Sequence, residues 1–148
     1  MPQSYVQFYC HIVFHTKYSE KLIGAEVENE LYAYIGGILK NYRSNPIKIG
    51  GTSDHIHVLC SLPKTMSISD LVEEIKKSSS KWIKTKGEVY NNFYWQDGYG
   101  CFSVSPFMSN TISNYISNQK LHHKTTNCMN EYKTLLNENG VEFDERYL

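Results

Sequence analysis

The chain has little of several features that mark familiar protein classes. Its 148 residues include only four cysteines and four prolines, and its formal net charge is zero at pH 7. The cysteines are widely separated and form no Cys-x-x-Cys pair, which excludes a zinc ribbon and a thioredoxin-like redox motif. Because no excess of positive charge attracts nucleic acid, any contact with DNA or RNA must depend on local patches.

Long apolar runs are also missing, and none reaches the length needed to cross a membrane. Residues 1–7 have neither the charged nor the apolar region of a signal peptide. The sequence has no glycine-rich P-loop, so no nucleotide cofactor is expected. We therefore expect a reducing, cytoplasmic setting in which the cysteines are free thiols, most of them buried in apolar runs.

The composition is typical of a globular protein, with 41% hydrophobic and 20% charged residues. No internal repeat, long linker or low-complexity tract interrupts the chain, and its length suits one domain with a hydrophobic core. We therefore expect a single domain over residues 1–148.

Hydrophobic periodicity predicts the order strand-helix-strand-strand-helix-strand, followed by two more helices. This order is typical of the split βαββαβ ferredoxin-like or RRM-like fold, an α+β class with an antiparallel sheet and two helices on one face. Proline, glycine and asparagine mark most of the boundaries. The predicted strands cover 5–18, 47–49, 55–62 and 98–105, and the predicted helices cover 25–41, 67–84, 106–123 and 127–139.

His55 and His57 form a His-Ile-His pattern within one predicted strand. Side chains alternate along a strand, so both imidazoles face one way while Ile56 faces the core. Two imidazoles on one face can bind a single metal ion, or they can be half-exposed histidines on a polar sheet face. The pair by itself does not decide between these interpretations. The polar side of the first strand, with His11 and His15, is expected to share that open face.

A second polar pattern lies in the predicted helix over 106–123. Tyr115 and Gln119 are four residues apart and therefore share one face of a helix. His122 and His123 lie about one turn further along the same helix. A solvated helix face is the alternative interpretation of this stripe.

In this combination the sequence resembles the TnpA-type single-tyrosine transposases of small bacterial and archaeal insertion sequences. These are members of the HUH nuclease superfamily and are related to the REP-associated tyrosine transposases. The resemblance covers nearly the whole chain. The matching segments are His-Thr-Lys-Tyr at 15–18, 51–63 around the histidine pair, Ile-Lys-Lys-Ser-Ser at 75–79, Trp-Gln-Asp-Gly-Tyr-Gly at 95–100, Ser-Val-Ser at 103–105, Tyr-Ile-Ser-Asn-Gln at 115–119, His122-His123, Glu131-Tyr132, Leu135-Leu136 and Gly140.

The resemblance implies an enzyme that cuts and rejoins single-stranded DNA at the ends of an insertion sequence. Tyr115 would attack the scissile phosphodiester and keep the 5′ phosphate as a phosphotyrosine. His55, His57 and Gln119 would bind one divalent ion, Mg²⁺ or Mn²⁺, which offsets negative charge that develops on the phosphate. Since this ligand set is neutral, the ion is expected to keep its full Lewis acidity.

The resemblance also implies the partners. The DNA would be a single strand that carries a hairpin at the element ends. One tyrosine allows one cleavage at a time, and excision needs two cuts, so a homodimer is expected. The tyrosine of one subunit can complete the histidine pair of the other in this family. The expected location is the prokaryotic cytoplasm, in association with the nucleoid.

Three residues near the predicted ligands have more than one interpretation. Asp54 can orient His55, or it can be a turn residue, which we favour from the sequence. His122 and His123 can contact DNA, assist a proton transfer or cap the end of their helix.

Lys76, Lys77, Lys81 and Lys84 give the predicted helix over 67–84 a basic face. These lysines can contact DNA phosphates, or they can form an ordinary solvated helix face. Trp95 and Tyr99 can stack on bases or belong to the core.

Three other functions compete with this hypothesis. A noncatalytic RRM-like binder of single strands would share the fold, but it would need no tyrosine in register with the histidine pair. A metal-dependent hydrolase would use water as the nucleophile and would form no covalent adduct. A domesticated relative would keep the chemistry while serving a host role.

Overall fold

The computed structural model describes residues 3–148. Met1 and Pro2 lie outside the described residues. Both belong to the predicted domain over 1–148 and to residues 1–7, where no signal peptide is expected. The strands are β1 (Tyr9–His15), β2 (Pro46–Gly51), β3 (His55–Ser61) and β4 (Gly100–Val104). The main helices are α1 (Glu28–Asn41), α2 (Ile68–Ile83), α3 (Ser109–Ser117), α4 (Gln119–His122) and α5 (Cys128–Glu138).

The strands form one antiparallel sheet in the order β2-β3-β1-β4. Strands β2 and β3 form a hairpin, and β3 lies in the interior of the sheet with the histidine pair on it. His57 pairs with Val13 of β1, and His55 pairs with His15. This arrangement confirms the α+β fold class and the βαββαβ order predicted from the sequence.

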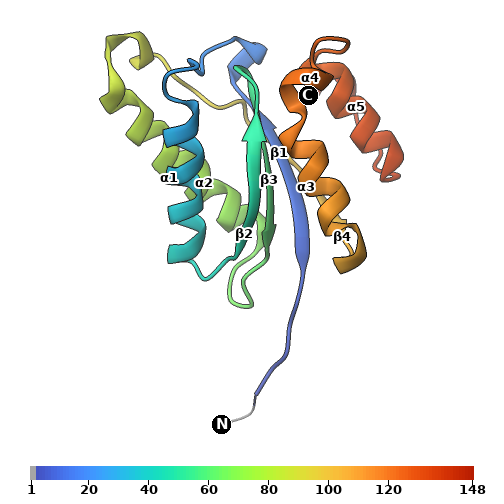
Figure 1. The fold of residues 1–148 in the computed structure, drawn as a ribbon. Helices are drawn as coiled ribbons and strands as arrows, with labels where there is room; N and C mark the ends of the chain where they lie inside the picture. Colours follow the sequence, from blue (N-terminus) through green and yellow to red (C-terminus); the bar gives the residue numbers. More distant parts are fainter. Residues whose placement is uncertain (1–2) are drawn as a thin grey trace.

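The two faces of the sheet are covered by different helices. Figure 1 shows α1 and α2 against one face, and α3, α4 and α5 against the other. The α1/α2 face contains the larger apolar cluster, in which Ile12, Phe14, Ile56 and Val58 of the sheet are at most 1% exposed. On the opposite face, Val13 belongs to a much smaller apolar cluster.

Local capping explains where two of the helices begin. The Ser67 side chain accepts a hydrogen bond from the Asp70 backbone N–H at the start of α2. The Asn127 side chain accepts one from the Asn130 backbone N–H at the start of α5. Each cap satisfies a backbone donor that the first helical turn leaves without a partner. Within residues 3–148, no helix is both long enough and apolar enough to span a membrane.

The first strand is shorter than the predicted 5–18. Tyr9 pairs with Ser61 and Val104, the last residues of β3 and β4, so the sheet offers no further strand partners before it. Val6 and Phe8 are consequently 49% and 62% exposed rather than directed at the core.

The helix predicted over 106–123 is divided into a short 3-10 turn, α3 and α4. Asn118 leaves helical geometry, with φ −97° and ψ 17°, and separates α3 from α4. Tyr115 and Gln119 therefore lie on two successive helices, α3 and α4, rather than on one continuous helix.

Candidate active site

His55 and His57 lie on the sheet face that α3, α4 and α5 cover, and both are 0% exposed. The prediction that this face is open is therefore wrong. The two added helical segments do not extend away from the sheet but close over it (Figure 1). The histidine pair is thus part of a buried polar cluster, where unpaired polar groups would be costly.

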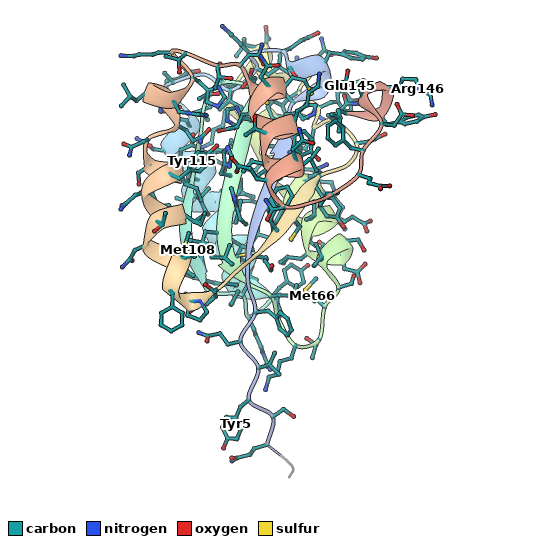
Figure 2. All side chains as sticks on the ribbon, turned by 90° about the vertical axis from the view of Figure 1, so that its right-hand side faces the viewer. Tyr5, Met66, Met108, Tyr115, Glu145 and Arg146 are labelled. Carbon is teal, nitrogen blue, oxygen red and sulfur yellow. The ribbon has the colours of Figure 1, made fainter. Side chains whose placement is uncertain are left out.

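The predicted residues of this cluster come together. The Nε2 atom of His55 lies 2.7 Å from Oε1 of Gln119, and Gln119 is itself buried. Tyr115 is half-buried, and its ring lies edge-on to the ring of His57, with 5.7 Å between the centroids. Figure 2 shows Tyr115 on its helix beside the sheet. Two distant stretches of sequence, β3 and the α3/α4 segment, therefore supply one cluster.

The centre of the cluster is Glu131 of α5, to which the sequence analysis assigned no role. Its Oε1 atom lies 2.9 Å from Nε2 of His57 and 3.3 Å from Nε2 of His55. Its Oε2 atom accepts hydrogen bonds from the Tyr115 hydroxyl and, at 2.9 Å, from Nε2 of Gln119. One carboxylate thus contacts all four predicted catalytic and metal-binding side chains.

A signal for Glu131 is present in the sequence. The buried residues of α5 are Cys128, Glu131, Tyr132 and Leu136, so the glutamate lies within the apolar stripe of its helix. Glutamate is rarely buried unless it is paired. A charged residue at a core-facing helical position is therefore a reason to look for a polar site.

The surroundings shift the pKa values within the cluster. Burial raises the pKa of the Glu131 carboxyl, but hydrogen bonds from His55 and His57 outweigh burial and lower it well below its usual range. Burial and the hydrogen bond to Glu131 raise the pKa of Tyr115. The cluster therefore contains a carboxylate and a protonated phenol besides the neutral ligands predicted from the sequence.

Hydrogen bonds hold the histidine rings in place. Asp54 Oδ1 lies 2.7 Å from His55 Nδ1 and also accepts a hydrogen bond from the Thr52 hydroxyl. This contact supports the orienting role of Asp54 that the sequence analysis ranked below a turn residue. On the other ring, His57 Nδ1 lies 2.7 Å from Nε2 of His11. Both Nε2 atoms of the pair are consequently directed at Glu131.

His122 and His123 border the cluster. The Nε2 atoms of His122 and His123 lie 3.4 Å and 3.1 Å from the Glu131 carboxylate. His123 Nδ1 donates to the Thr126 carbonyl at 3.0 Å. The two histidines therefore surround the glutamate despite the break at Asn118.

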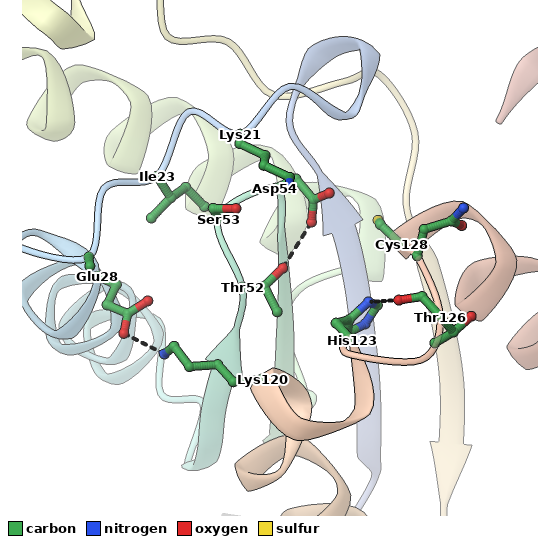
Figure 3. A pocket seen from close by; sticks show the side chains of 12 residues that line it. Lys21, Ile23, Glu28, Thr52, Ser53, Asp54, Lys120, His123, Thr126 and Cys128 are labelled. Atoms are coloured by element: carbon green, nitrogen blue, oxygen red, sulfur yellow. Dashed lines mark hydrogen bonds and ion pairs between the residues drawn. The ribbon is translucent and has the colours of Figure 1, made fainter.

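A cavity of about 380 Å³ lies beside His123 and Asp54 (Figure 3). Lys21 and Lys120 also line it, and Lys120 pairs with Glu28. A second cavity, of about 300 Å³, is lined by Tyr115 together with Glu131. Tyr115 therefore borders this cavity as well as the buried cluster.

Of the lysines predicted to bind DNA, Lys76, Lys77 and Lys81 belong to α2 and Lys84 directly follows its last residue. Helix α2 covers the sheet face opposite α3, the helix that contains Tyr115 (Figure 1). Lys76 is half-buried and donates to the carbonyls of Gln96 and Gly98, and Lys77 pairs with Glu74. Lys84 lies over the Tyr94 ring, and Lys81 is exposed.

Two other predicted features belong to the core. Trp95 is 8% exposed and packs edge-on against Phe14. The four cysteines are free thiols, and Cys10, Cys60 and Cys128 are buried, as the sequence predicted.

The donor set fits a divalent cation. His55, His57 and Glu131 each offer one ligand atom, and these atoms lie within 4.8 Å of one another. Imidazole nitrogen together with carboxylate oxygen is a set that binds Mn²⁺ and other first-row divalent ions.

The family model for IS200-like transposases matches residues 4–119, which include the histidine pair, Tyr115 and Gln119. The chain belongs to the IS200-like transposases. This result confirms the resemblance stated from the sequence, and it identifies an enzyme class that cuts DNA and transfers strands. Glu131, at the centre of the cluster, lies beyond the matched residues.

Known relatives agree with this assignment. The IS200-like transposase chain is 24% identical over 114 residues to the ISDra2 transposase TnpA of Deinococcus radiodurans, covering 74% of this chain and 81% of the relative. Its fold is similar to a crystal structure of a Deinococcus radiodurans transposase, with a TM-score of 0.62, 22% identity and coverage of 80% and 96% of the two chains. It is also similar to a REP-associated tyrosine transposase bound to a REP hairpin, with a TM-score of 0.60, 16% identity and coverage of 83% and 73%.

Proposed function

We propose that this chain cuts and rejoins single-stranded DNA at the ends of an insertion sequence, with Tyr115 as the nucleophile. The observation that carries the proposal is the contact between the Tyr115 side chain and the buried cluster of His55, His57 and Gln119. A binding module would have no need for a phenol in register with two buried imidazoles and an amide. We also propose that residues 1–148 act as one transposase domain.

In the first step, the Tyr115 oxygen forms a bond to the scissile phosphorus, and the bond from phosphorus to the 3′ oxygen breaks. The phenol gives up its proton and the 3′ oxygen gains one, which leaves a 3′ hydroxyl and a 5′ phosphotyrosine. In the second step, a 3′ hydroxyl loses its proton and attacks the phosphotyrosine phosphorus, the bond from phosphorus to the Tyr115 oxygen breaks, and the phenol regains its proton as the phosphodiester is restored. Because the covalent bond conserves the phosphodiester energy, rejoining requires no ATP.

His55, His57 and Gln119 would hold a divalent ion, Mg²⁺ or Mn²⁺, at the buried cluster. When bound, the ion supplies positive charge that offsets the charge developing on the nonbridging phosphate oxygens. Asp54 and His11 keep the two imidazole rings oriented from their outer nitrogens. The raised pKa of Tyr115 means that its phenolate needs such a compensating charge.

The partners follow from the same proposal. One structural neighbour is a REP-associated tyrosine transposase bound to a REP hairpin, and we propose that this chain likewise binds a DNA hairpin. Excision needs two cuts and each chain has one such tyrosine, so the active form would be a homodimer. Tyr115 lies edge-on to His57 of its own chain, and we propose cleavage in cis as the starting arrangement.

The test is a denaturing-gel assay for a covalent adduct. Labelled single strands from the DNA that flanks the gene are incubated with wild type, Tyr115→Phe and Tyr34→Phe, with Mn²⁺ or EDTA. A duplex of the same sequence serves as a second control. We expect an adduct with wild type and Tyr34→Phe, on single strands and with Mn²⁺ only, and none with Tyr115→Phe.

Two outcomes contradict the proposal. Specific binding without any adduct would indicate a noncatalytic single-strand binder. Cleavage that persists in Tyr115→Phe and leaves no adduct would indicate a hydrolase with water as the nucleophile.

A further inference from the structure

Glu131 is a buried carboxylate that the proposed reaction has not yet used. It comes from α5, outside the segments that supply the histidine pair, Tyr115 and Gln119. It is 4% exposed, and both of its oxygens contact side chains of the cluster.

We propose that Glu131 is a further, charged ligand of the divalent ion, and that its second oxygen aligns the Tyr115 hydroxyl beside that ion. The inference rests on the proposed metal site at His55 and His57. It adds a ligand from a third part of the chain and couples the nucleophile to the ion through one carboxylate.

The distances between the ligand atoms support this role. A first-row divalent ion holds nitrogen and oxygen ligands at about 2.0–2.2 Å, so neighbouring ligand atoms at right angles lie about 3.0 Å apart. Glu131 Oε1 lies 2.9 Å from Nε2 of His57 and 3.3 Å from Nε2 of His55. Both distances from Oε1 are therefore close to the spacing of neighbouring ligands of one ion, and one ligand atom from each of the three residues lies within 4.8 Å of the others.

The charge of the buried Glu131 side chain also supports its role as a metal ligand. A desolvated carboxylate is costly unless an opposite charge compensates it. The ion-pair partners of Glu131 within residues 3–148 are all histidines, namely His55, His57, His122 and His123, and no lysine or arginine is among them. A divalent cation between the carboxylate and the two imidazole nitrogens would compensate the charge directly.

The second oxygen explains the position of the nucleophile. Glu131 Oε2 accepts the hydrogen bond of the Tyr115 hydroxyl and that of Gln119 Nε2. If Oε1 binds the ion, the same rigid group holds the phenol oxygen close to it. Such positioning of reacting groups is worth several orders of magnitude in rate when it is exact, and small displacements reduce it.

A carboxylate ligand also affects the choice of metal. Carboxylate oxygen favours hard ions such as Mg²⁺ and Mn²⁺, whereas two imidazoles with a neutral amide discriminate less against softer ions. Replacing the carboxylate by an amide should therefore weaken Mn²⁺ binding in particular.

The first measurement is calorimetric titration of Mn²⁺ into chelator-treated protein without DNA. The variants are Glu131→Gln, His57→Ala and the matched control Glu138→Gln, which removes the same charge from an exposed position on α5. We expect Glu131→Gln to raise the dissociation constant at least about tenfold. We expect Glu138→Gln to change it less than about twofold and His57→Ala to abolish binding.

The outcomes separate the two proposals. If His57→Ala abolishes binding but Glu131→Gln binds Mn²⁺ as wild type does, Glu131 is not a ligand and the proposed metal site stands. If wild type does not bind Mn²⁺, or if His57→Ala binds it normally, both the metal site and the role of Glu131 are overturned.

A spectroscopic readout and a second variant distinguish the loss of a metal ligand from misfolding of the variant. The visible absorption of bound Co²⁺ reports its ligands, and we expect its bands to differ between wild type and Glu131→Gln. Glu131→Asp keeps the charge on a shorter side chain, so we expect it to retain more Mn²⁺ affinity than Glu131→Gln while forming the Tyr115 adduct more slowly than wild type. Identical Co²⁺ spectra in wild type and both Glu131 variants, all of them folded by circular dichroism, would refute the ligand role.

Discussion

The two faces of the sheet differ although the same strands build both. Toward α1 and α2, β3 directs Ile56 and Val58 into the large apolar cluster. Toward α3, α4 and α5, the same strand directs His55 and His57 into a cluster of histidine, amide, phenol and carboxylate groups. One face thus stabilises the fold by burying apolar surface, and the other buries ionisable groups that are costly without partners.

The residues that stabilise the fold and the residues of the candidate site therefore lie on opposite faces of one sheet. The apolar cluster on the site face, built from Val13, Phe102, Tyr132 and Leu136, is small. Substitutions on the α1/α2 face should therefore act mainly on unfolding, and those on the site face should act mainly on binding and catalysis.

Leu31→Ala should give the largest effect on stability. Leu31 of α1 is 0% exposed in the apolar cluster, and truncation leaves a cavity. We expect the free energy of unfolding to fall by about 2–5 kcal/mol, measured by urea denaturation. Mn²⁺ affinity below the transition should stay within about twofold of wild type. A loss of less than about 1 kcal/mol, or a changed Mn²⁺ affinity, would break the separation between the faces.

Two glycines allow a matched test on both faces. A Cβ at Gly50 of β2 would lie 3.0 Å from the carbonyl oxygen of Ile116, between Tyr115 and Gln119. Gly50→Ala should therefore shift α3, cost about 1–3 kcal/mol and slow adduct formation about tenfold.

Gly37→Ala is the control on the other face. Its Cβ would meet nothing within 4 Å on α1, so we expect a gain of about 0.5–1 kcal/mol and unchanged adduct formation. Thermal melts and the gel assay measure both effects. Equal adduct rates in Gly50→Ala and Gly37→Ala would show that the close approach of α3 is unimportant for catalysis.

Lys76, on the α1/α2 face, should make the free energy of unfolding depend on pH. Burial lowers the pKa of Lys76 from 10.5 to about 8, while its ammonium group donates to the Gln96 and Gly98 carbonyls. Between about pH 8 and 10.5 the unfolded chain holds a proton that the folded chain has lost, so stability from this group rises with pH.

The measurement is urea denaturation of wild type and Lys76→Met between pH 6 and 10. The stability of wild type relative to Lys76→Met should be constant below about pH 7 and should increase toward pH 10. A relative stability that stays flat over the whole range would show that the Lys76 ammonium is not desolvated in the folded chain.

Of these substitutions, Lys81→Ala should have the smallest effect, and we expect that effect on DNA binding. Lys81 is exposed on α2, and a single phosphate contact would weaken DNA binding modestly for all sequences. We expect the salt dependence of binding, as the slope of log affinity against log salt, to decrease by about 1. Lys40→Ala, at an exposed site near the end of α1, is the control. An unchanged slope would leave α2 with a purely structural role.

Much of the fold could be predicted because local rules agree with the tertiary structure. Alternation in β3 and helical spacing in α2 and α5 each predicted an element close to its observed bounds. The strand predicted from residue 5 was wrong because alternation continues where the sheet offers no partner. The helix predicted to residue 123 was wrong because the sequence around Asn118 carries no proline or glycine to mark the break.

The sequence by itself determined which residue types are available for the chemistry. His55 and His57 share a strand face, and Tyr115 and Gln119 are near neighbours on a helical segment, because these spacings follow from strand and helix periods. The same periods cannot give the distance between two elements. Only the tertiary structure closed α3, α4 and α5 over the sheet, brought Glu131 to both histidines, and directed Asp54 at His55. The contacts of Glu131 join residues far apart in the chain, and packing between elements decides them.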